Sequence, residues 1–149
     1  MRIIHFPAIV DPTGTLTAVE NLPFEIRRVF WLYDLPGGAG RGGHAHYKLE
    51  EILIALSGSF DVQTLDAHGA HRWHLNRANE GLLIPPATWR QLCNFSTNAV
   101  ALVLASTLYD KADYINSYEE FRASLPTLAE CYFDRRARAT TLEELQRTT

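Results

Sequence analysis

The strongest constraint on the fold of this chain is a series of short apolar and β-branched runs that are separated by turn signals. Residues 28–33, 60–65, 71–75 and 89–95 each have the length and composition of a β-strand. Residues 99–105 are wholly apolar, which is typical of a strand buried on both faces. Many short strands at near-regular spacing predict a sandwich or barrel, and 149 residues suffice for one domain with a sizeable core.

Composition excludes several functional classes. The net charge of −3 provides no basic surface that would favour nucleic acid or an anionic membrane as a partner. The two cysteines, Cys93 and Cys131, have neither metal-site nor disulfide spacing. The first seven residues are too short and interrupted for a signal peptide, and no run approaches the ~20 apolar residues of a membrane span. We expect a cytoplasmic protein.

Two histidines one residue apart, His44 and His46, are the main candidates for chemistry. Side chains alternate along a strand, so both histidines point to the same face. A glycine-rich loop, residues 36–40, precedes them, and the apolar run 52–56 follows and ends at a turn signal. We therefore expect the pair at the start of a buried strand, directly after a flexible loop.

The spacing around this pair resembles the first motif of the cupin superfamily. Gly38, His44, His46, Glu51 and Gly58 form the pattern G-x5-H-x-H-x4-E-x6-G. The resemblance implies an all-β fold, the cupin double-sheet jelly roll. In metal-binding cupins the two histidines and the glutamate are ligands. In this chain the glutamate has a second interpretation, because a carboxylate often orients a histidine instead.

A second cupin motif supplies a third histidine ligand, and here that position differs. The best match is residues 85–94, in which Arg90 occupies the histidine position. Arginine stays protonated and cannot bind a cation as a ligand. We therefore expect neither metal nor cofactor. Arg90 could contact substrate, or it could be a rim arginine paired with Glu50 or Glu51.

The pattern changes past residue 106. Residues 117–121 predict a helical turn, and residues 141–144 form a possible capping box near the end of the chain. We expect a cupin domain over residues 1–122 and a C-terminal tail over residues 123–149 that is partly helical, so that the jelly roll carries a short C-terminal helical segment.

A set of motifs in one order makes the resemblance more specific than the superfamily. The segments are residues 28–30, 41–46, 57–62, 104–110, 113–115 and 118–121. Together they resemble the sugar 3,4-ketoisomerases, or WxcM-like cupins, over about residues 1–122. The resemblance implies action on dTDP-4-oxo-6-deoxy-D-glucose, whose carbonyl moves from C4 to C3 to give a 3-oxo sugar that an aminotransferase can use. It also implies a homodimer without metal, and residues 2–6 are a candidate for pairing between subunits.

The residue types fit this reaction. Moving a carbonyl to the adjacent carbon needs an acid–base group with a pKa near neutrality, and histidine has one of about 6.5. We take His44 and His46 as catalytic and favour His44, nearest the glycine loop, as the base. Cations could stabilise the enediolate or bind the diphosphate, and aromatic rings could stack on thymine or sugar. The candidate substrate-binding residues are Tyr33, Arg41, Lys48, Trp89, Arg90 and Tyr109. Arg41, on the glycine loop, suits the diphosphate.

Two other functions remain compatible with the sequence. A sugar-nucleotide 3- or 3,5-epimerase also removes a proton beside a carbonyl but returns it to the same carbon. A non-enzymatic or metal-binding cupin is the second alternative. The sequence fixes neither the nucleotide nor the configuration at C4 of the product, galacto or gluco.

Overall fold

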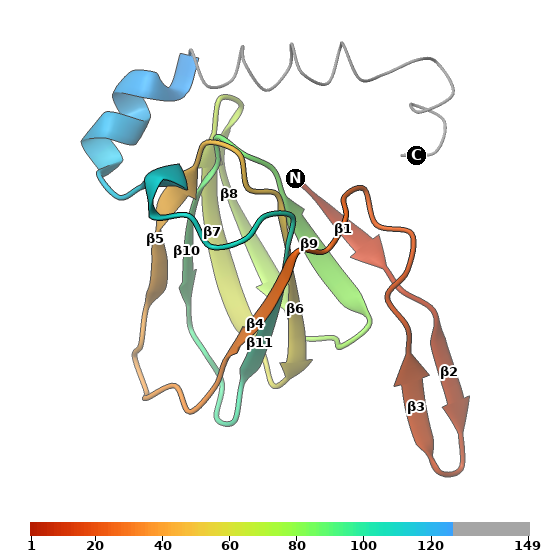
Figure 1. The fold of residues 1–149 in the computed structure, drawn as a ribbon. Helices are drawn as coiled ribbons and strands as arrows, with labels where there is room; N and C mark the ends of the chain where they lie inside the picture. Colours follow the sequence, from red (N-terminus) through yellow and green to blue (C-terminus); the bar gives the residue numbers. More distant parts are fainter. Residues whose placement is uncertain (127–149) are drawn as a thin grey trace.

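The computed structural model describes residues 1–126, which form two five-stranded antiparallel sheets and a separate hairpin (Figure 1). The first sheet has the order β1 (Arg2–His5), β9 (Glu80–Ile84), β6 (Glu51–Ser57), β11 (Val100–Ala105), β4 (Arg28–Leu32). The second has the order β12 (Tyr114–Ile115), β5 (Arg41–His46), β10 (Trp89–Cys93), β7 (Phe60–Asp66), β8 (Gly69–Leu75). The hairpin consists of β2 (Ala8–Asp11) and β3 (Gly14–Thr17).

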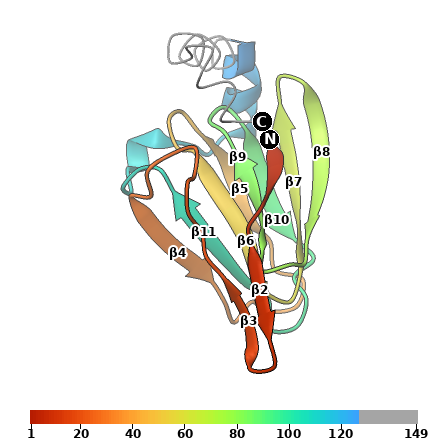
Figure 2. The ribbon, with the colours of Figure 1, turned by 90° about the vertical axis from the view of Figure 1, so that its right-hand side faces the viewer.

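The two larger sheets face each other and enclose the main core (Figure 2). Leu53 and Ala55 of β6 meet Phe60 and Val62 of β7 and Leu92 of β10 between them. Both sheets thus bury the alternate side chains that the strand pattern assigns to one face. The all-β double-sheet jelly roll is confirmed.

The outer face of the first sheet carries a second apolar cluster. Ile52 and Ile54 of β6 and Leu104 of β11 are buried there under Phe6 and the segment around Leu22. Since β6 and β11 contribute side chains to both clusters, they are covered on both faces. The wholly apolar run 99–105 is therefore explained, as predicted, by a strand buried on two sides.

The histidine pair lies elsewhere than the sequence suggests. His44 and His46 are at the end of their own strand, β5, in the second sheet, whereas the apolar run that follows forms β6 in the first sheet. A corner over residues 47–50 carries the chain from one sheet to the other. The expectation that the pair begins the buried strand is wrong. Arg41 is likewise the first residue of β5, not part of the loop.

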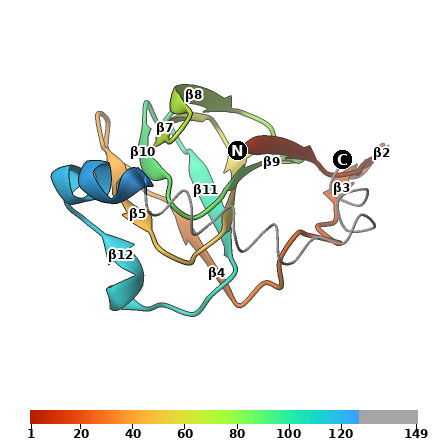
Figure 3. The same cartoon turned by 90° about the horizontal axis from the view of Figure 1, so that it is seen from above.

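The C-terminal part of the described chain covers the edge of the second sheet beside β5 and β10 (Figure 3). A short 3-10 helix, η1 (Lys111–Asp113), precedes β12, and a helix begins at residue 118 and runs to residue 126. The Ser117 hydroxyl accepts a hydrogen bond from the Glu120 backbone N–H at 3.1 Å, which caps this helix, and the helical turn predicted over residues 117–121 is confirmed.

Residues 127–149 lie outside the described part of the chain, and so do Cys131 and the capping box at residues 141–144. The division into a domain over 1–122 and a tail over 123–149 stays a prediction. Within residues 1–126, no helix is long and apolar enough to span a bilayer.

The β2–β3 hairpin projects from the sandwich as an arm (Figures 1 and 2). All four residues of β2 are exposed, and Ile9, Val10 and Leu16 have exposed fractions of 64%, 73% and 59%. Residues 2–5 form β1, which pairs with β9 on one side and is the edge strand of its sheet on the other. Pairing of residues 2–6 between subunits therefore stays a prediction, and the arm adds further exposed apolar surface.

Candidate active site

The two histidines of β5 share one face, as predicted, and form an aromatic cluster with a tyrosine. Their ring centroids are 4.9 Å apart in an edge-on arrangement. Tyr114 of β12 pairs with His46 in the adjacent strand, and its ring centroid lies 4.3 Å from that of His46 and 5.0 Å from that of His44. His46 is 1% exposed, whereas His44 is partly open. Tyr114 therefore fixes both imidazoles against one wall of the sandwich.

Asp113 orients His46. The Nδ1 atom of His46 lies 3.1 Å from Oδ2 of Asp113. The backbone N–H groups of Lys48 and Leu49 also donate to this carboxylate, at 2.8 Å and 3.2 Å. A carboxylate that accepts these hydrogen bonds holds the His46 proton on Nδ1, so that Nε2 keeps its lone pair for a substrate.

The electrostatics of the cluster keep both histidines neutral. Burial, followed by the charges of Arg90 and His44, lowers the pKa of His46 to about 2. Burial and the Arg90 charge also lower the pKa of His44. Burial raises the pKa of Asp113, while the hydrogen bonds from Lys48 and Leu49 oppose this rise. A neutral imidazole has a lone pair that can accept a proton, so both side chains are in the protonation state that a general base requires.

Arg90 is buried and bound to Glu51. Its Nε lies 2.8 Å from Oε1 of Glu51, and both side chains are less than a tenth exposed. The pair joins β10 of one sheet to β6 of the other. The rim location considered for Arg90 is thus wrong, although the pairing with Glu51 is confirmed. Glu51 contacts this arginine and not a histidine, so the orienting carboxylate is Asp113 instead.

The carboxylate and guanidinium occupy the positions that would hold a metal in a metal-binding cupin. Glu51 faces the cation of Arg90, whose charge repels any metal ion near the histidines. Among residues 1–126, no three His, Cys, Asp or Glu side chains are grouped so that they could hold a metal ion. The residues present do not fit a metal, and activity without metal stays a prediction.

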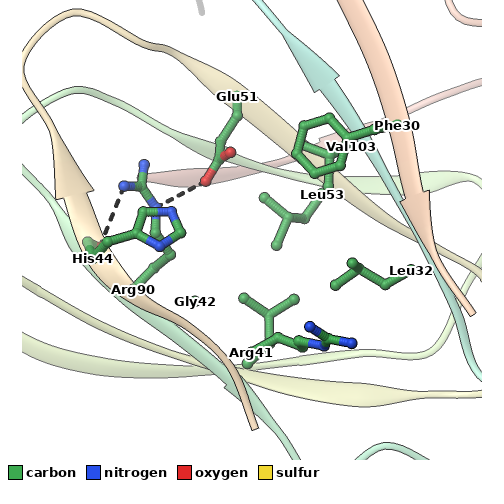
Figure 4. A pocket seen from close by; sticks show the side chains of 10 residues that line it. Phe30, Leu32, Arg41, Gly42, His44, Glu51, Leu53, Arg90 and Val103 are labelled. Carbon is green, nitrogen blue, oxygen red and sulfur yellow. Dashed lines mark hydrogen bonds and ion pairs between the residues drawn. The ribbon is translucent and has the colours of Figure 1, made fainter. Parts of the chain in front are cut away.

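A cavity of about 120 Å³ lies between the sheets beside His44 (Figure 4). His44, Glu51 and Arg90 lie together on one side of it, and Arg41 lies across from them beside apolar residues such as Leu32 (Figure 4). The residues that line it are Phe30, Leu32, Arg41, Gly42, His44, Glu51, Leu53, Arg90, Leu92 and Val103. Such a cavity suits a ligand with both polar and apolar edges.

Gly42 allows β5 to lie close to β10 at this cavity. Its φ of +85° is strained for other residues, and a Cβ there would lie 2.7 Å from the carbonyl oxygen of Arg90. The register between the strands also shifts between Arg90 and Gln91. Strict alternation of side chains from His44 back to Arg41 would point Arg41 away from the cavity. The shift in register instead places Arg41 at the cavity.

The structure brings only some of the predicted substrate-binding residues to this site. Arg41 and Arg90 line the cavity, and the Tyr109 ring lies 5.8 Å from that of Tyr114. Trp89 faces away from Arg90 and packs against the helix over residues 118–126. Among the remaining candidates, Tyr33 is 60% exposed and the side chain of Lys48 is also exposed.

Sequence reasoning missed two residues of this site, Asp113 and Tyr114. Both belong to the segment 113–115, which recurs in the ketoisomerase motif set but received no role. Their proximity to the histidines depends on the pairing of β12 with β5, which no local pattern indicates.

Comparison with known proteins identifies the family. The family model described as FdtA: WxcM-like, C-terminal matches residues 1–125. The TDP-4-oxo-6-deoxy-alpha-D-glucose-3,4-oxoisomerase of Aneurinibacillus thermoaerophilus is 40% identical over 124 residues, which are 81% of this chain and 89% of that protein.

Solved structures of 3,4-ketoisomerases share the fold. QdtA from Thermoanaerobacterium thermosaccharolyticum, in complex with TDP, is 35% identical with a TM-score of 0.82, covering 85% of this chain and 94% of its own. WlaRB from Campylobacter jejuni, a TDP-quinovose 3,4-ketoisomerase, is 45% identical with a TM-score of 0.77, and the match covers 80% of this chain and 95% of WlaRB. A dTDP-4-dehydrorhamnose 3,5-epimerase from Bacillus anthracis, at 13% identity and a TM-score of 0.67, shares the fold alone. This chain therefore belongs to the WxcM-like family of sugar 3,4-ketoisomerases.

Proposed function

We propose that this protein moves the carbonyl of dTDP-4-oxo-6-deoxy-D-glucose from C4 to C3. The observation that carries the proposal is the neutral pair His44 and His46, with Asp113 behind His46, at a cavity between the sheets. The names of the curated relative and of the TDP-bound neighbour support the nucleotide sugar as substrate. A cytoplasmic location is part of the same proposal.

His46 acts as the general base. Its Nε2 removes the proton from C3, the electron pair of that C–H bond forms a C3–C4 double bond, and the C4 carbonyl oxygen becomes an enediolate oxygen. The Asp113 carboxylate stabilises the resulting imidazolium through Nδ1. The sequence favours His44 for this role; we assign it to His46 because His46 contacts Asp113.

The second half of the reaction uses His44. The hydroxyl proton of O3 passes to O4, O3 becomes the carbonyl, and C4 receives a proton. His44 lines the cavity and its ring adjoins that of His46, so the proton that His46 takes from C3 can pass to the neutral His44, which delivers it to C4 and leaves both imidazoles neutral again. Arg90 lies across from His44 in β10 and adds positive charge near the developing enediolate.

Arg41 is the proposed ligand of the diphosphate. It is exposed and lines the cavity, and a guanidinium can bind two phosphate oxygens at once. Tyr109 is also exposed next to Tyr114, where its ring could contact thymine or sugar.

We also propose that the protein is a homodimer in which the β2–β3 arm contacts a second copy. An isolated two-stranded hairpin is marginally stable in water, so an arm with exposed Ile9, Val10 and Leu16 requires apolar cover. Each chain offers such cover on the outer face of β4, where Val29 and Trp31 are 47% and 56% exposed. A two-fold axis would bury the arm of each protomer on the other.

The reaction itself is tested in heavy water with dTDP-4-oxo-6-deoxy-D-glucose and NMR of the product. A 3-oxo product with deuterium at C4 is expected, because the proton delivered to C4 exchanges with solvent. A carbonyl retained at C4, with deuterium confined to C3 or C5, would contradict the proposal and indicate an epimerase.

A further inference from the structure

Arg28 extends the active site beyond the cavity. It is the first residue of β4 and lies two positions before Phe30, so its side chain points to the same interior face. On the facing sheet, His46 lies two positions after His44. Phe30 and His44 both line the cavity, so Arg28 and His46 continue its two walls.

Aromatic rings, and not a carboxylate, hold the Arg28 guanidinium. Its central carbon lies 5.0 Å from the centroid of the Phe30 ring and 5.6 Å from that of Tyr109. Cation–π contacts of this kind fix the position of the charge without neutralising it. Tyr109 in turn contacts Tyr114, the tyrosine that packs on both histidines.

Within residues 1–126, Arg28 forms no ion pair, and its buried Nε has no hydrogen-bond acceptor. Ala105 separates it from Glu51, because Ala105 pairs with Arg28 on one side and with Glu51 on the other. The backbones of Arg28 and Glu51 are therefore two strand spacings apart, about 10 Å. Glu51 is moreover bound to Arg90. Arg28 is therefore a cation without an ion-pair partner in the part of the chain that the structure describes.

A buried donor without an acceptor is rare in native proteins. Here it accompanies an uncompensated charge that faces the catalytic histidines, and this charge contributes to keeping the pKa of His46 low. We infer that Arg28 binds an anionic oxygen of the substrate. This inference rests on the proposed ketoisomerase function and adds a residue to which no role has been given.

Two groups of a nucleotide-linked 4-oxo sugar could supply that oxygen. One is the sugar oxygen that becomes negative in the enediolate, and the other is the diphosphate. Both are anionic and both suit a guanidinium. The two groups differ in the stage at which Arg28 would contact them. The diphosphate is charged before the reaction, whereas the enediolate is formed only during it.

The test compares Arg28→Met and Arg28→Lys with Arg27→Met. Arg27 is the matched control, because it is the adjacent arginine, directly precedes β4 and is exposed. For each variant, kcat, KM and the Kd of TDP alone are measured by NMR assay and calorimetry, with circular dichroism as the check on folding.

For Arg28→Met we expect a loss of about 10²–10³ in kcat with the Kd of TDP unchanged if the enediolate oxygen is bound. A rise of tenfold or more in the Kd of TDP would instead assign the contact to the diphosphate. Arg28→Lys keeps the positive charge and should recover part of the kcat that Arg28→Met loses. It also serves as the test variant if Arg28→Met does not fold. Arg27→Met should match the wild type.

If the folded Arg28→Met and Arg28→Lys variants keep kcat, KM and TDP binding within about threefold of the wild type, the inference is overturned while the ketoisomerase proposal stands. If the wild-type protein itself does not convert the substrate, the proposed function is wrong. In that case the Kd of TDP alone still decides whether Arg28 binds a diphosphate.

Discussion

Nδ1 of His46 lies 3.1 Å from Oδ2 of Asp113, a residue 67 positions later in the chain. The contact joins the end of β5 to the 3-10 helix η1, and backbone N–H groups of the corner after β5 hold the carboxylate in place. One side chain therefore sets both the tautomer of the imidazole and the geometry of the corner that carries the chain between the sheets.

Replacing Asp113 by asparagine should abolish most of the activity. The amide is close in size to the carboxylate, but it no longer stabilises the imidazolium and can impose the wrong tautomer. The expected loss in kcat is about 10²–10⁴-fold, with a smaller change in the Kd of TDP. The control is Asp110→Asn in the same turn, because asparagine also serves as an N-cap. Equal kcat values for the two variants would exclude the orienting role of Asp113.

An exchange experiment should distinguish the roles of the two histidines. His46→Asn should lose exchange of the C3 proton with heavy water, because it removes the base. His44→Asn should keep that exchange while turnover falls, because it removes the donor to C4. Each change is expected to lower kcat by about 10²–10⁴-fold. Near-normal turnover of both variants would make the pair a structural feature only, and exchange lost in His44→Asn alone would restore His44 as the base.

Protein stability should fall as pH drops below about 6.5. The pKa of His46 is about 2 in the folded protein and near 6.5 in the unfolded chain, so the unfolded chain binds the proton first and protonation favours unfolding. Between pH 6.5 and 5, this histidine should contribute a slope of up to about 1.4 kcal/mol per pH unit.

Urea unfolding across this pH range tests the slope. The pKa of His44 is lowered as well, so the wild type should lose stability through both histidines. His46→Asn should show a shallower dependence of the unfolding free energy on pH than the wild type does. Parallel curves for the two proteins would contradict the assignment of a neutral, buried His46.

The parts of the fold that depend on neighbouring residues could be predicted from the sequence. The hairpin of β7 and β8 follows from alternation in residues 60–65 and from the turn at residues 66–69, where the Asp66 carboxylate accepts a hydrogen bond from the His68 backbone N–H. The burial of β11 follows equally from its composition, because a strand without polar residues needs cover on both faces.

The parts that depend on distant contacts could not be predicted. The corner at residues 47–50 contains neither glycine nor proline, because hydrogen bonds to Asp113 hold it instead. Alternation gave the right face for His44 and His46 but could not show that Asp113 and Tyr114 lie against them. Trp89 illustrates the same limit, since only the position of the C-terminal helix explains its location.

Disrupting the arm should dissociate the dimer. Ile9 and Leu16 form a cross-strand pair in the β2–β3 hairpin. Changing both to lysine should convert dimer to monomer in light scattering at micromolar concentration, because like charges would then oppose burial. Ala67→Lys, at the exposed β7–β8 turn, is the control. A wild-type monomer, or a double variant that stays dimeric, would contradict the role of the arm.

Activity should survive removal of metal ions. The Arg90 guanidinium lies beside the one carboxylate that would complete a cupin metal site with the histidines, so we expect full turnover after treatment with EDTA. Elemental analysis of the purified protein should find no stoichiometric transition metal. Loss of activity that one added metal restores would overturn this prediction.

The Arg90–Glu51 pair has a consequence for how this enzyme can evolve. Removing water from two charges is costly, and an apolar pair of similar volume often stabilises a protein as well or better. Selection for stability alone would thus tend to replace both residues together. Loss of either one alone would leave a buried charge, at a cost of about 3–5 kcal/mol. The two positions are therefore coupled, and a lineage that keeps both retains a buried charge pair that is in place before any substrate arrives.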